Sequence, residues 1–71
     1  MKSLFDRARD IQHGVLESRM VARMETEGRP LTDAETINEL RYLQETLPYA
    51  GLEKEDLKPI MKAINYLLKN P

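Results

Sequence analysis

The sequence contains no cysteine, no tryptophan and no long apolar run. Without cysteine the chain has no disulfide, no thiolate nucleophile and no cysteine zinc site, a composition typical of a reducing compartment. No stretch approaches the ~20 apolar residues of a membrane-spanning helix, and the charges of Asp6 and Arg7 come before any signal-peptide apolar core could form. We therefore expect a cytoplasmic protein with no membrane attachment.

An excess of charge of one sign is also missing. Eleven lysines and arginines face twelve aspartates and glutamates, which leaves a formal net charge of −1. So balanced a chain has no overall cationic field to attract phosphates, and we do not expect nucleic acid as its partner.

Motifs for catalysis are absent as well. The three glycines, at positions 14, 28 and 51, are too far apart for a phosphate-binding loop. Neither Ser3 nor Ser18 lies in the sequence context of a nucleophile elbow. The sequence therefore predicts that the protein is not an enzyme and holds no cofactor.

The 71 residues suffice for one domain, residues 1–71, which turn formers divide into three segments. The divisions fall at residues 28–30 and 47–51, where glycine and proline cluster. No segment alternates polar and apolar residues as a strand would. We predict an all-α fold of three helices, of which the last two form a hairpin. Their expected ranges are about 3–27, 33–47 and 57–69.

The first predicted helix carries apolar residues on two faces. At about 100° per residue one seam runs along its length, formed by Leu4, Ala8, Ile11, Val15, Ser18 and Ala22. Phe5, Leu16 and Met20 point to the opposite side, with Met24 further round. Because a helical hairpin covers only one face of a neighbouring helix, this second apolar set predicts a partner or a second copy. Gly14 either permits a close helix approach or marks a kink.

The two later helices have clearer starts. Thr32 and Glu35 form the pattern of a capping box, with Leu31 as the hydrophobic staple. Asp56 is the expected N-cap of the last helix, with Pro59 in its first turn. The core stripes are Ala34, Ile37, Leu40, Leu43 and Leu47 in one helix and Leu57, Ile60, Met61, Ile64, Leu67 and Leu68 in the other.

So small a chain also needs a way to stabilise itself. Below about 70 to 80 residues a single core rarely yields more than about 3 to 5 kcal/mol. A first helix of ~24 residues would be ~36 Å long, longer than the hairpin that covers it. We therefore predict a small helical bundle completed by homodimerisation.

These features predict an interaction protein that binds itself and another protein as a regulator, inhibitor or assembly factor. The expected partner-binding residues are Phe5, Leu16, Met20, Met24, Arg19 and Arg23. Tyr42, Tyr49 and Tyr66 belong either to the rim of the core or to an interface as aromatic anchors.

An alternative is a DNA-binding regulator of the helix-turn-helix kind. In this interpretation the last helix offers nucleic acid its polar side chains, which are Lys54, Lys58, Lys62 and Asn65. The helix has no arginine to read guanine, which weakens the case.

A second alternative is a metal-binding helical dimer. Asp10, His13 and Glu17 would lie within about two turns of a continuous helix. Asp10 and His13 have the spacing of the carboxylate and histidine pair in di-iron helical bundles, with aspartate in place of glutamate. The signal is weak, because acids beside a histidine are common on surface helices.

Overall fold

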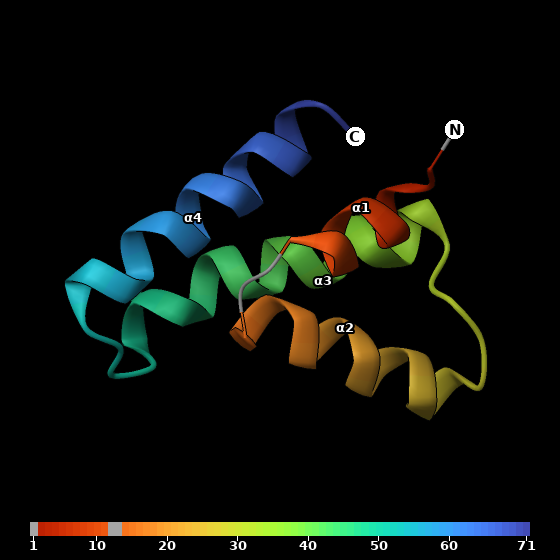
Figure 1. Ribbon diagram of the computed structural model, residues 1–71, viewed down its shortest axis with the longest axis horizontal. Coiled ribbons are helices and arrows are strands. Elements are labelled where there is room, and N and C mark those ends of the chain that lie inside the picture. Colours follow the sequence, from red (N-terminus) through yellow and green to blue (C-terminus); the bar gives the residue numbers. More distant parts are fainter. Residues whose placement is uncertain (1, 12–13) are drawn as a thin grey trace.

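A computed structural model describes residues 2–11 and 14–71 of the chain. Within these residues it contains four α-helices, one short 3-10 helix and no strand, so the all-α prediction is confirmed and the count of three helices is not. The elements are α1 (Leu4–Asp10), α2 (Gly14–Glu27), α3 (Asp33–Thr46), η1 (Leu47–Tyr49) and α4 (Lys54–Lys69). In Figure 1, α3 lies between α4 and α2, and α1 packs against the other three helices. None of the helices in the described ranges is both long and apolar enough to cross a membrane.

The prediction of one long helix over residues 3–27 is wrong. Helix α1 ends at Asp10, and Ile11 has the extended backbone angles φ −68° and ψ 113°. Helix α2 begins at Gly14, which is exposed, and an added Cβ there would meet nothing within 4 Å. Gly14 therefore does not serve a close helix approach.

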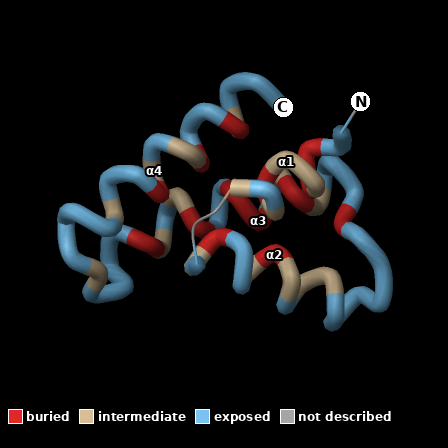
Figure 2. The backbone as a smooth tube through the Cα atoms, viewed as in Figure 1, coloured by how far each residue is buried: buried red, intermediate tan, exposed pale blue. Residues whose placement is uncertain are grey.

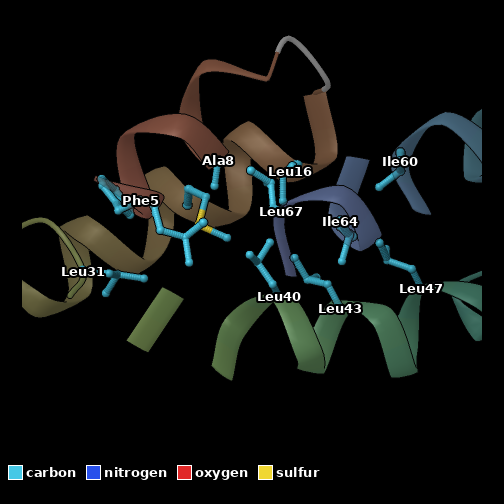
Figure 3. Packing of buried hydrophobic residues seen from close by; sticks show 12 residues of the cluster. Phe5, Ala8, Leu16, Leu31, Leu40, Leu43, Leu47, Ile60, Ile64 and Leu67 are labelled. Carbon is cyan, nitrogen blue, oxygen red and sulfur yellow. The ribbon is translucent and has the colours of Figure 1, made fainter. Parts of the chain in front are cut away.

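The break brings both apolar faces of this segment into one core. Phe5, Leu16 and Met20 are 0% exposed, so the prediction that they face away from the core is also wrong. Leu4 and Ala8 of the other face are buried beside them, because α1 packs against α2. Side chains from all four helices converge in this core (Figure 3).

The energetic reason for the break is the size of these side chains. Burying a large apolar side chain is worth about 1.5–3 kcal/mol relative to leaving it exposed. A backbone hydrogen bond contributes only about 0.5–1.5 kcal/mol net, because water replaces it in the unfolded chain. Three buried side chains thus outweigh the few helical hydrogen bonds that the break removes.

Helix α3 begins at the predicted capping box. The Thr32 hydroxyl accepts a hydrogen bond from the Glu35 amide at 3.2 Å, and the Glu35 carboxylate accepts one from the Thr32 amide at 2.9 Å. The Asp33 carboxylate also accepts from the backbone N–H of Leu4 at 3.2 Å, which ties the start of α1 to the start of α3. Leu31, the expected staple residue, is buried.

Helix α4 begins earlier than predicted, at Lys54 behind Glu53. Asp56 is not its N-cap but lies in its first turn, and its amide donates to the Glu53 carbonyl at 3.1 Å. Pro59 consequently lies inside the helix, where it removes one backbone donor. The buried residues of α4 lie on the side that faces the rest of the molecule (Figure 2), and they are Ile60, Ile64 and Leu67.

Candidate functional site

A cleft of ≈ 360 Å³ lies between α2 and α3. Two of the predicted partner-binding residues, Arg19 and Arg23, stand on its α2 side. Their spacing of four residues places them one turn apart on the same helix face. The lining residues are Arg19, Arg23, Glu35, Asn38, Glu39 and Tyr42.

Glu39 forms the floor of this cleft, with only 5% of its side chain exposed. Its Oε1 accepts a hydrogen bond from Nε of Arg19, and its Oε2 accepts one from Nη1 of Arg23 at 3.3 Å. A buried carboxylate without such partners would be costly, so the hydrogen bonds from the two arginines offset the loss of water around Glu39. The hydrogen bond to Glu39 also raises the pKa of the Arg19 guanidinium above its usual value.

The guanidinium of Arg19 also lies over the ring of Tyr42, 5.2 Å from the ring centroid. Tyr42 is 51% exposed, so this cation–π pair stands at the surface of the cleft. Nη2 of Arg23 lies 3.4 Å from the Glu27 carboxylate, while its Nε is buried without a hydrogen-bond partner in the described part of the chain. The two arginines are thus held in place by α3 and by α2 itself.

A second ion pair borders the cleft. Arg29 donates to both carboxylate oxygens of Glu35, at 2.7 and 3.1 Å. This hydrogen bonding, together with the bond from the Thr32 amide, lowers the pKa of Glu35 from its ordinary 4.5 to about 2. Glu35 therefore stays ionised and paired across the whole range of physiological pH.

The other predicted partner-binding residues are not at a surface cleft. Phe5, Leu16 and Met20 belong to the core, as described above. Met24 is half-buried against the core, and its sulfur accepts a weak hydrogen bond from Nη1 of Arg9 at 3.9 Å. The apolar face expected to bind a partner is therefore not available in this fold.

Sequence reasoning missed the contribution of α3 to the cleft. Asn38 and Glu39 were not among the predicted partner-binding residues, and Tyr42 was considered only as a rim residue or an anchor. The spacing of Arg19 and Arg23 shows a basic stripe on one helix, but no sequence pattern indicates that Glu39 would lie beneath it.

Two of the predicted metal ligands lie on different helices. Asp10 ends α1, whereas Glu17 lies on α2. The Asp10 carboxylate pairs with the Lys2 ammonium, whose hydrogen bond lowers the pKa of Asp10. His13 lies outside the described residues, and no group of three or more metal-binding side chains occurs within them.

The residues of the helix-turn-helix alternative are exposed on α4. The side-chain carbonyl of Asn65 accepts a hydrogen bond from the side-chain amide of Gln44 on α3 at 2.6 Å. Helix α4 follows α3 in the opposite direction (Figure 1). Residues 47–53 connect the two helices, whereas a helix-turn-helix has a turn of about three to four residues. This longer connection does not favour the helix-turn-helix alternative.

Comparison with known proteins finds no relative. No protein family matches the chain, and no curated protein or solved structure is significantly similar to it.

Proposed function

We propose that this protein is a non-enzymatic interaction module that binds a partner protein through the cleft between α2 and α3. The observation that carries the proposal is the pair of Arg19 and half-exposed Tyr42 above the buried Glu39 carboxylate. Tyrosine and arginine are the side chains that most often dominate the energy of protein interfaces. Because Glu39 already orients the two arginines, little side-chain freedom would be lost on binding.

The electrostatics of the cleft support binding in preference to catalysis. A general acid needs a carboxyl group with a raised pKa, but the pKa of Glu35 is lowered by Arg29. Both carboxylate oxygens of Glu39 already accept hydrogen bonds from arginines, so they are not free to contact a substrate. We propose a regulator, inhibitor or assembly factor on these grounds.

Homodimerisation stays a prediction of the sequence. It depended on an exposed apolar face of Phe5, Leu16 and Met20, and these residues are buried within one chain. The proposed cleft is complete in a single copy, so partner binding does not depend on a dimer. Light scattering over a range of protein concentrations measures the oligomeric state directly.

The proposal is tested by comparing partner capture by the wild type and Tyr42→Ala. Each immobilised protein is exposed to a lysate of the source cells, and the retained proteins are quantified by mass spectrometry. Loss of an interface anchor costs about 2 kcal/mol or more, so we expect at least one retained protein to decrease by about 30-fold with Tyr42→Ala.

Tyr49→Ala provides the matched control. Tyr49 is 89% exposed on η1 and does not line the cleft, so its replacement is expected to leave capture unchanged. Circular dichroism checks that both variants keep the helical fold. Identical sets of captured proteins from the wild type and both variants would contradict the proposal.

A further inference from the structure

The lysines of this chain are concentrated on one helix. Four of the five lie on α4, and the fifth is Lys2. At 3.6 residues per turn, the four fall within an arc of about 80° around the helix and extend over about 22 Å of its length. We call this arc the lysine face, and its residues are Lys54, Lys58, Lys62 and Lys69.

All four side chains of the lysine face are exposed, and no salt bridge compensates their charges within the described residues. By contrast, Lys2 is paired with Asp10. Glu53, Glu55 and Asp56 lie in or beside the first turn of α4 and offset charge near Lys54 and Lys58, whereas no acidic residue lies within one turn of Lys62 or Lys69 along the helix. The net charge of −1 does not cancel this local field, because charges beyond about 10 Å are screened at 0.1 M salt.

Tyr66, which is 61% exposed, borders the lysine face, but no large aliphatic side chain of α4 is exposed. The large aliphatic residues of α4, including Ile60 and Ile64, point into the core, so they are not free to form the apolar centre of a protein interface. For the same reason α4 has no free apolar face to insert into a membrane. A partner held here must itself be a dense array of negative charge.

We infer that the lysine face binds the phosphate backbone of nucleic acid without reading its bases. Lysine contacts phosphate as a point charge, whereas base recognition relies largely on arginine and on free amide groups. Helix α4 has no arginine, and the Asn65 carbonyl oxygen is already bonded to Gln44. This surface is separate from the α2–α3 cleft and does not depend on the function proposed for it.

The test is the salt dependence of binding to a fluorescent 20-base-pair DNA duplex of random sequence. Anisotropy titrations run from 20 to 200 mM salt. Four neutralised phosphates predict that log K falls with log salt at a slope of about −3.6. The double variant Lys58→Gln/Lys62→Gln is expected to reduce that slope to about −1.8, because two contacts are lost.

Lys2→Gln is the control, since it removes a lysine that is outside α4 and already paired with Asp10. It is expected to keep the wild-type slope, as is Tyr42→Ala in the cleft. Glutamine has a helix propensity close to that of lysine, and circular dichroism verifies that the double variant remains folded.

Three results would overturn the inference. One is the absence of duplex binding at 20 mM salt. Another is a slope that changes equally in Lys2→Gln and in the double variant. The third is a clear preference for a poly-glutamate peptide over the duplex, which would identify an acidic protein segment as the partner.

Discussion

The carboxylate of Glu35 contacts the start of α3 and the loop before it, and it also lines the cleft. It accepts hydrogen bonds from the Thr32 amide at the start of α3 and from Arg29 in the preceding loop, and it lines the cleft beside Asn38. These bonds favour the ionised form, and the pKa of Glu35 falls to about 2. The same residue therefore caps a helix and fixes the position of a loop arginine.

The lowered pKa makes a contribution to stability that depends on pH. A folded pKa of about 2 lies below the ordinary value of 4.5, so the charged form stabilises the fold. The contribution is fully present above about pH 4.5 and is lost as the pH falls towards 2. We predict that the difference in unfolding free energy between the wild type and Glu35→Gln, measured in urea, is largest near pH 7 and shrinks below pH 4.5.

Glutamine suits this comparison because it also occurs at this position of capping boxes, so the variant removes chiefly the charge. Glu25→Gln is the control, since Glu25 is exposed and forms no salt bridge within the described residues. If the difference in unfolding free energy between the wild type and Glu35→Gln stayed constant from pH 7 to pH 2.5, the lowered pKa of Glu35 would be contradicted.

At the scale of elements, the end of α2 determines where the next segment starts. Gly28 follows Glu27 with φ +71°, and the Arg29 amide donates to the Met24 carbonyl at 3.2 Å. This is the hydrogen bond of a Schellman motif, in which glycine is preferred because its left-handed backbone costs no Cβ clash. The motif also orients Arg29 towards Glu35.

We predict that Gly28→Ala lowers the unfolding free energy by about 1 kcal/mol, because an L residue is strained at this backbone angle. Gly14→Ala is the matched control, since Gly14 is also exposed but its φ is not positive. An added Cβ meets nothing within 4 Å at either site, so only the backbone angle distinguishes them. Urea unfolding of both variants measures the difference, and equal effects would show that the angle is not the cause.

At the scale of the whole molecule, local patterns were predictable and the packing of the first segment was not. The capping box at Thr32 and the buried stripe through Ile60 and Ile64 depend on residues within a few positions of each other. The break after Asp10 depends on distant residues, because two apolar faces are compatible with a straight helix between two partners or with two helices sharing one core. Only the available packing partners decide between these arrangements.

The cleft, too, was predictable from the sequence only in part. Arg19 and Arg23 are visible in the sequence as neighbours one turn apart, and both line the cleft. Glu39 and Tyr42 are brought to that face only when α2 lies along α3. Long-range ion pairs of this kind have no signal in a single sequence.

A substitution at Leu16 distinguishes best between two arrangements. In one, Leu16 lies on an exposed face that pairs with a second copy; in the other, it lies in a core closed within one chain. On an exposed second face, Leu16→Glu would weaken self-association and preserve helicity. Leu16 is instead 0% exposed, so an unpaired carboxylate there would have to be buried. We predict that Leu16→Glu unfolds the isolated chain, because the cost exceeds the roughly 3 to 5 kcal/mol that a core of this size supplies.

The measurement is helicity by circular dichroism together with mass by light scattering. Ser18→Glu, two residues further along α2 and exposed, is expected to retain the wild-type signal in both. A Leu16→Glu protein that stays helical and changes from dimer to monomer would show that this face forms an interface between copies, and that the core is not closed within one chain. A wild type that is monomeric by light scattering, together with loss of helicity in Leu16→Glu alone, would show that a single chain buries both of its apolar faces.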